Sequence, residues 1–194
     1  MHSVMPAYYP FILFIVTGCL NETLSSILVA NGHFTTVNNN IYVLLESLIL
    51  VFFLQKTKRP EASLSLCVPL MVTCILFWTL ETFLLKSIYI TSSYFRIYYS
   101  FLVVLLSISN INKIVVTETD HLLNNPLFLI CICFISYYTL KVIIEAFLLY
   151  GIKYSDLVLS NIYNILIYVN LLINLIYTIV LLWIPRKQFS LLKL

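Results

Sequence analysis

The sequence predicts an all-α protein, a polytopic bundle of six transmembrane helices that forms one membrane domain over residues 1–194. Apolar residues make up 61% of the chain and charged residues only 10%, and the mean hydropathy is +1.00. A soluble domain of this length needs far more charge to cover its surface. The apolar residues also come in blocks of about 20, the length that a helix needs to cross the hydrocarbon core of a bilayer.

Six blocks are long enough to span, and we expect the helices at residues 7–30, 39–55, 66–86, 94–114, 126–150 and 157–183. Asn125 followed by Pro126 predicts an N-cap with proline at the first helical position, which sets the start of the fifth helix. Pro185 ends the sixth helix. The first block lacks a basic leading segment and a small-residue cleavage site, so we interpret it as a helix that stays attached.

The basic residues predict the orientation, because cytoplasmic loops carry an excess of lysine and arginine. Three of them lie on one side of the six predicted spans: Lys86, Arg96 and Lys153. Seven lie on the other side: Lys56, Lys58, Arg59, Lys113, Arg186, Lys187 and Lys193. We therefore expect both the N-terminus and the C-terminus in the cytoplasm, and the protein in the inner (plasma) membrane of a cell.

Several polar residues lie inside the apolar blocks, where a charge costs about 2.5–3.5 kcal/mol on insertion scales. With 1.5 Å of helix rise per residue, all of them fall in the outer half of the membrane or near its middle. The set comprises Glu22, Glu46, Glu81, Lys141, Glu145, Asn161 and Asn164. We expect these residues to form a polar cavity that opens outward. Lys141 and Glu145 are four residues apart and are expected to pair along one helix face.

A structural interpretation of the same residues stays open. Glu22 and Glu81 would then reach the membrane interface from the ends of their spans. The lysine–glutamate pair and the asparagines would hold neighbouring helices together, at about 0.6 kcal/mol for each hydrogen bond.

The sequence argues against several other classes of protein. It has no H-E-x-x-H, G-x-S-x-G or P-loop motif, so we expect neither an enzyme nor a bound cofactor or metal. The five cysteines lie in apolar blocks, where a thiol packs as a small hydrophobic group. There is no dense basic stripe, so we expect no nucleic-acid partner. The lipid bilayer is the one partner that composition requires.

Three stretches resemble a known family: Asn38–Glu46 before a basic cluster, Asn125–Ile130, and a closing span that contains Asn161, Asn164, Asn170 and Tyr177. They are similar to a family of small uncharacterised bacterial multi-pass membrane proteins, over residues 11–187. Members often have one more helix in front, and some are encoded near sensor histidine kinases. The resemblance implies a six- or seven-helix membrane fold and a signalling kinase as a possible partner, and it brings no established activity.

Four functional hypotheses follow. The first is a membrane sensor or accessory subunit that binds a small or lipid-like ligand in the outward cavity and passes a helix shift to a cytoplasmic or membrane partner. The second is a small transporter or ion-conducting protein that uses the intramembrane carboxylates, although only three glycines are present to break helices. The third is a structural partner in a membrane complex. The least supported is an intramembrane enzyme that acts on lipids with a glutamate as its base.

Overall fold

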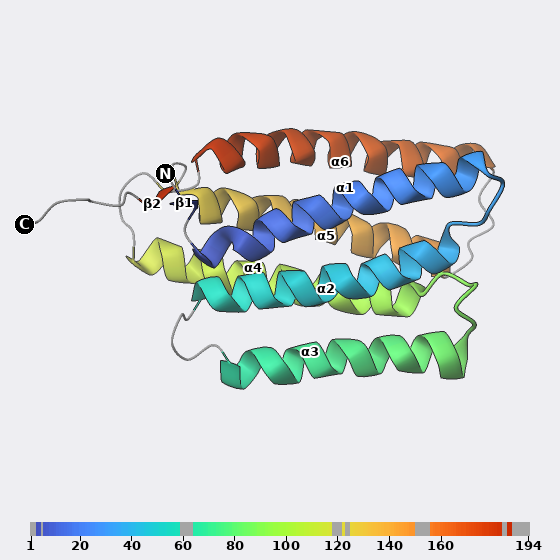
Figure 1. Ribbon diagram of the computed structural model, residues 1–194, viewed down its shortest axis with the longest axis horizontal. Coiled ribbons are helices and arrows are strands. Elements are labelled where there is room, and N and C mark those ends of the chain that lie inside the picture. The colour runs from blue at the N-terminus through green and yellow to red at the C-terminus, as the bar shows by residue number, and fades with distance from the viewer. Residues whose placement is uncertain are drawn as a thin grey trace, which may run out of the picture.

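The computed structural model confirms that the protein is helical and describes residues 3–4, 6–58, 64–117, 122, 125–149, 156–183 and 186–187. Successive long helices run in alternating directions, side by side (Figure 1). Their bounds lie within a few residues of the predicted blocks. They are α1 (Tyr9–Ala30), α2 (Thr36–Lys58), α3 (Leu64–Thr79), α4 (Ser93–Thr117), α5 (Pro126–Leu149) and α6 (Asp156–Trp183). A short helix, η1 (Pro6–Tyr8), leads into α1.

Five helices of the described chain are long and apolar enough to cross a membrane. These are α1, α2, α4, α5, and α3 together with the residues that continue it to Leu85. In α6 the described apolar stretch is shorter, Ile167–Leu182. Large apolar side chains on the outer helix faces are exposed, among them Leu105, Leu172 and Leu175. Such a surface requires lipid rather than water around it, so the chain is a membrane protein with transmembrane helices.

Helix α2 begins at Thr36, three residues earlier than the sequence indicated. The predicted start was Asn39, which lies in a run of three asparagines. In the structure the side-chain amide of Asn38 donates to Asn21 Oδ1 at 2.8 Å and to Ser25 Oγ at 3.0 Å, both on α1. These bonds satisfy the polar side chains between two helices, and the first turn of α2 can form in their presence.

The third helix differs from the prediction of a continuous α-helix. After Thr79 the backbone widens into a π-helical segment, η2 (Leu80–Leu85), which ends at Lys86. Segments of this kind are uncommon and often occur at functional sites. Here the widened turn contains Glu81, whose side chain is fully buried and points to the start of α4.

An aromatic cluster closes one end of the bundle. Phe11 on α1 meets Tyr177 on α6 edge to face, with ring centroids 5.4 Å apart, and it lies 5.6 Å from Phe53 on α2. Phe134 on α5 packs against both Phe53 and Tyr177. Edge-to-face contacts of this kind add to the burial of apolar surface. The cluster therefore joins four helices into a dry core.

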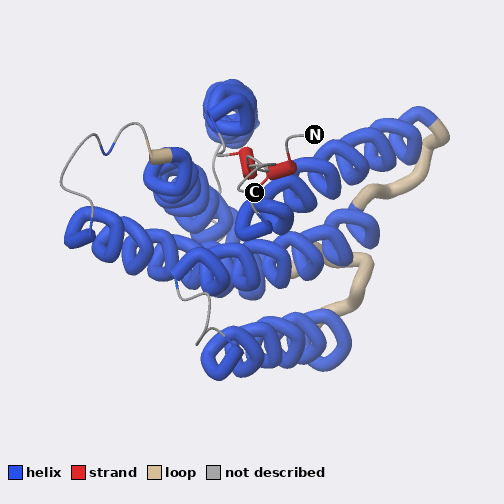
Figure 2. The backbone as a smooth tube through the Cα atoms, turned by 60° about the vertical axis from the view of Figure 1, so that its left-hand side comes forward, coloured by secondary structure: helices blue, strands red, loops and turns tan. Residues whose placement is uncertain are grey.

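Two short strands, from near the start and near the end of the chain, lie beyond this aromatic core (Figure 1). Strand β1 (Ser3–Val4) pairs in antiparallel fashion with β2 (Arg186–Lys187), which brings residues near the start and the end of the chain together (Figure 2). We call this end of the bundle the terminal end. The opposite end carries the α1–α2 and α3–α4 connections, and we call it the cleft end because it holds the cavity described below (Figure 1).

Candidate functional site

Glu46 lies in the middle of α2 and is only 4% exposed. It follows Thr36 by ten residues, which places it about 15 Å below the cleft end of its helix. Its Oε2 accepts a hydrogen bond from the Tyr99 hydroxyl of α4 at 2.8 Å, and its Oε1 accepts one from the Tyr138 hydroxyl of α5 at 2.7 Å. A buried carboxylate is tolerated only with such partners, so Glu46 ties three helices together.

Lys141 supplies the positive charge beside this carboxylate. Its Nζ lies 3.5 Å from Glu46 Oε2 and also donates a hydrogen bond to the Tyr99 hydroxyl. Three tyrosine rings surround the ammonium group, with centroids at 5.0 Å for Tyr99, 5.6 Å for Tyr137 and 5.5 Å for Tyr138. The ring faces attract a cation and partly replace its hydration.

A second ion pair lies closer to the helix ends. Arg96 on α4 donates from one terminal nitrogen to Glu145 Oε1 on α5, at 3.3 Å. The pair is incompletely satisfied, because Arg96 Nε and Glu145 Oε2 are both buried without a hydrogen-bond partner among the described residues. Glu145 is itself only 6% exposed. A buried polar atom without a partner costs about 1–3 kcal/mol, so both atoms favour an additional partner such as water or a ligand.

These two ion pairs replace the one predicted along α5. Lys141 and Glu145 share a helix face as the spacing requires, but each pairs with a different helix: Lys141 with Glu46 and Glu145 with Arg96. Pairs between helices are possible here because α4 and α5 pack along their length and α2 lies against α4. The spacing of four residues therefore indicated the face correctly and the partner wrongly.

A cavity of about 540 Å³ lies beside the two pairs, between α1, α2, α4 and α5. Its charged lining residues are Glu22, Arg96, Lys141 and Glu145. The uncharged part of the lining comes from the same four helices and from the α1–α2 and α3–α4 connections: Asn21, Thr35, Thr36, Asn39, Tyr42, Val43, Thr91, Ser93, Tyr137, Ile144 and Leu148. The volume falls within the range of about 300–1,000 Å³ that is typical of small-molecule sites.

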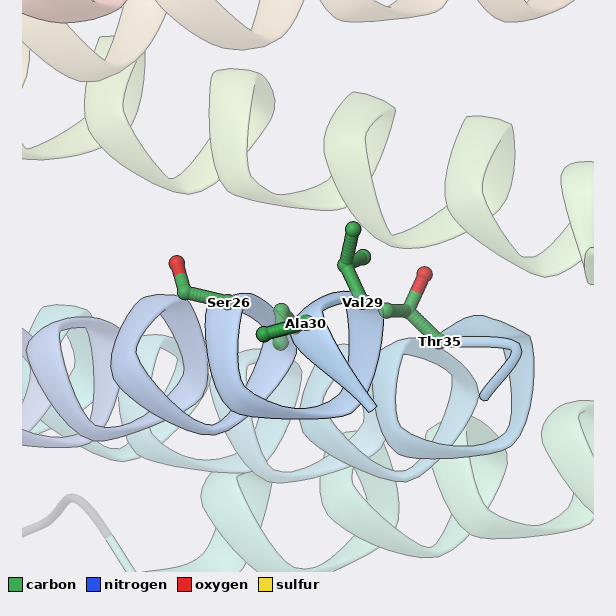
Figure 3. Close-up of a pocket in the computed structure, with 5 residues that line it drawn as sticks. Ser26, Val29, Ala30 and Thr35 are labelled. Carbon is green, nitrogen blue, oxygen red and sulfur yellow. The ribbon is translucent and has the colours of Figure 1, made fainter. Parts of the chain in front are cut away.

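A second hollow, of about 440 Å³, lies at the turn between α1 and α2. Ser26, Val29, Ala30 and Thr35 surround it, and the side chains of Val29 and Thr35 point to the same side of the turn (Figure 3). No charged side chain lines it within the part of the chain that the structure describes. The larger cavity, which we call the polar cleft, is the stronger candidate for a functional site.

The structure brings four of the seven predicted polar residues to this region. Glu22, Lys141 and Glu145 line the polar cleft, and Glu46 lies beneath it as the partner of Lys141. Asn164 is exposed and does not line the cleft. Asn161 belongs to α6, and its side chain lies outside the described residues.

Glu81 does not line the polar cleft and instead stabilises the start of α4. Its carboxylate accepts hydrogen bonds from the backbone N–H groups of Tyr94 at 3.1 Å and Phe95 at 2.5 Å, and it pairs with Lys86 at 3.1 Å. Backbone N–H groups at a helix start lack partners within the helix, and a carboxylate there also complements the helix dipole. Glu81 therefore caps α4 from the end of the preceding helix.

Asn40 fixes the α3–α4 connection next to the cleft. Its side-chain amide donates to the carbonyl oxygens of Ile88 and Ile90, both at 2.9 Å, and its Oδ1 accepts from Ser92 N at 3.3 Å. The indole of Trp78 donates to the backbone carbonyl of Asn40 at 3.0 Å. These bonds hold the connection against α2 and position the start of α4, which carries Arg96.

Sequence reasoning missed Arg96 and the tyrosines of the site. Arg96 was counted only among the basic residues that predict the orientation, and no tyrosine of the site was among the predicted residues. Helical spacing contained a signal for both: Arg96 and Tyr99 are three apart on α4, and Tyr137, Lys141 and Glu145 are four apart on α5. Residues at these spacings lie on one face of a helix.

The described residues contain no group of three or more histidine, cysteine, aspartate or glutamate side chains that could hold a metal ion. All five cysteines are free thiols. The polar cleft offers ionic recognition and hydrogen bonding by two cations, two lining carboxylates and the tyrosine hydroxyls.

No model of a known protein family matches this chain, and no curated protein and no solved structure is significantly similar to it. The resemblance to small bacterial multi-pass membrane proteins therefore stays a prediction. Function has to be argued from the geometry of the polar cleft.

Proposed function

We propose that this protein is a membrane sensor or accessory subunit that binds a small ligand in the polar cleft from the outer side of the membrane. Six spans with both termini in the cytoplasm would direct the cleft end outward. The proposal includes the inner (plasma) membrane as location and a cytoplasmic or membrane protein, such as a signalling kinase, as partner. The short connections between the helices offer no domain that could produce a signal alone.

One observation supports this function above the others: the bundle has a cleft with ionic groups at one end and a closed aromatic core at the other. Its lining residues do not include Phe11, Phe53, Phe134 or Tyr177, which close the terminal end. A cavity closed on one side suits binding better than passage. Three of the four helices that line the cleft, α1, α2 and α5, also meet in that core, so a change in the cleft can be transmitted to their far ends.

The interhelical ion pairs supply the coupling. Arg96–Glu145 joins α4 to α5, and Lys141–Glu46 joins α5 to α2. A ligand that competes for one partner of either pair changes the force between two helices. Helix shifts of about 1–2 Å at interfaces are a common form of such switching.

The test measures this coupling without knowledge of the ligand. Spin labels are attached at Tyr9→Cys on α1 and Val116→Cys on α4, both exposed toward the terminal end, in a chain without its native cysteines. Distances between them in nanodiscs are compared for the chain with and without Arg96→Gln. We expect a shift of about 1–2 Å when the ion pair is removed. Phe34→Ala, in the α1–α2 connection, changes a side chain that is 93% exposed and does not line the cleft; it is the control and should leave the distance unchanged. An identical distance distribution with Arg96→Gln contradicts a sensor.

A transporter or ion-conducting protein is the second candidate, and a buried polar line on α4 favours it. Ser100 and Ser107 are fully buried, and their hydroxyls have no hydrogen-bond partner among the residues that the structure describes; Asn110 follows on the same face. From Ser100 to Asn110 the line extends about 15 Å from the Glu46 site toward the terminal end. Proton flux into proteoliposomes that Glu46→Gln abolishes would establish this function, and absence of flux would support the sensor.

A further inference from the structure

The charges of the polar cleft indicate which ligand it suits, and this inference rests on the proposed function. Arg96 and Lys141 present two positive groups, and Glu22 and Glu145 present two negative ones. Lys141 is already held by Glu46 and the Tyr99 hydroxyl, whereas Glu22 is exposed in the cleft with no ion pair among the described residues. A simple anion would meet two carboxylates, and a simple cation would meet a guanidinium. Only a ligand with both signs of charge matches this lining.

The unsatisfied atoms of the Arg96–Glu145 pair define two recognition points. Glu145 lines the cleft and is more than nine-tenths buried, yet its Oε2 accepts no hydrogen bond from the part of the chain that the structure describes. A buried carboxylate oxygen in this state requires a donor, preferably a charged one. On the other side of the pair, Arg96 Nε has no acceptor within the described chain. A guanidinium edge favours a planar carboxylate or a phosphate, to which it can donate two parallel hydrogen bonds.

We infer that the polar cleft binds a zwitterion in which an anionic oxygen group, carboxylate or phosphate, is joined to a primary ammonium group. The ammonium donates to Glu145 and is attracted by Glu22, and the anionic group accepts from Arg96. The ligand inserts between the partners of the Arg96–Glu145 pair, so binding replaces one contact between α4 and α5 by two contacts through the ligand. The chemistry is shared by free amino acids, by free phosphoethanolamine and by the headgroup of phosphatidylethanolamine.

The experiment compares ligands that share the anionic group and differ in trimethylation of the nitrogen, which removes its hydrogen-bond donors and keeps its charge. The full chain in phosphatidylglycerol nanodiscs is titrated with glycine and glycine betaine, and with phosphoethanolamine and phosphocholine, by calorimetry. We expect a primary ammonium ligand to bind at least about tenfold more tightly than its trimethylated counterpart, because a lost charged hydrogen bond costs about 1.5–3 kcal/mol. Glu145→Gln should reduce this ratio toward one, and Arg96→Gln should weaken binding of both members of a pair.

A parallel arm distinguishes the source of the ligand. If the free compounds do not bind, the unfolding midpoint is compared in nanodiscs of phosphatidylethanolamine and phosphatidylcholine. A higher midpoint with phosphatidylethanolamine that Glu145→Gln removes identifies the lipid headgroup as the ligand. Two results with the unsubstituted chain would overturn the inference. One is equal binding of primary and trimethylated ligands, and the other is no effect of either the free compounds or the lipid.

The spin-label distances separate this outcome from a failure of the proposed function. If Arg96→Gln shifts the terminal end and no zwitterion binds, the sensor stands and the ligand class is wrong. If a zwitterion binds and the distances do not change, the cleft recognises the ligand and the sensor proposal fails.

Discussion

Replacing Lys141 with methionine tests the energetics of the central ion pair. Methionine keeps the length of the side chain and removes its charge, so Glu46 loses the cation that lies 3.5 Å away. At an effective dielectric constant of about 20, two unit charges at 3.5 Å attract by about 5 kcal/mol. The two tyrosine hydroxyls that remain on Glu46 offset part of the loss. We expect Lys141→Met to lower the free energy of unfolding by about 3 kcal/mol, the lower end of the range for breaking a buried pair.

A second substitution, Glu46→Gln, added to Lys141→Met should restore most of the lost free energy of unfolding. Glu46→Gln removes the unpaired charge and keeps an oxygen that accepts from Tyr99 or Tyr138. The double variant should therefore lie within about 1 kcal/mol of the unmodified chain, because removing both charges avoids the desolvation penalty. Free energies of unfolding are measured by denaturant titration in mixed micelles. Lys113→Met, at an exposed position on α4, is the control and should change stability by less than about 1 kcal/mol. Strictly additive effects of the two cleft changes would refute the reasoning.

Three further changes test the parts of the fold that position the cleft. Glu81→Gln should cost about 1–2 kcal/mol and speed hydrogen exchange at the amide of Phe95, because it weakens the cap of α4. Unchanged exchange there would contradict the capping role. Phe134→Ala should cost about 3–5 kcal/mol, since it opens a cavity in the aromatic core at the terminal end; a loss below about 1 kcal/mol in denaturant titration would mean that the core is loosely packed. Asn40→Ala should release the α3–α4 connection and accelerate its proteolysis, with little change in helix content by circular dichroism. Equal proteolysis rates would show that Asn40 does not restrain it.

The helices were predictable because a bilayer fixes their length and forces their backbone groups to bond internally. The start of α5 was also predictable, because it depends on neighbouring residues alone. The Oδ1 of Asn125 accepts hydrogen bonds from the N–H groups of Leu127 and Phe128, as its position before Pro126 predicted. The early start of α2 was not predictable from local sequence, because Asn38 finds its partners on another helix.

The site was predictable in its residue types and not in its pairings. Depth along the helices identified Glu46, Lys141 and Glu145 as unusual, since each would be costly in lipid without a partner. Which partner each one has depends on how α2, α4 and α5 rotate about their axes, and periodicity within one helix does not contain that information. Glu81 was misjudged for a related reason, because its partners are backbone N–H groups of the next helix, which carry no side-chain signature.

The measurement that tests the central claim most directly is cysteine labelling at two adjacent positions on α5. Ile144 lines the polar cleft and is buried, whereas Ile143 is 46% exposed on the outer surface of the bundle and does not line it. Each is replaced by cysteine in a chain without native cysteines and treated with a membrane-impermeant maleimide on one side of the membrane at a time. Reaction of Ile144→Cys from the outside only, with no reaction of Ile143→Cys, is the result expected of a water-filled cleft that opens outward. No reaction of Ile144→Cys from either side, or reaction from the cytoplasmic side, would contradict it.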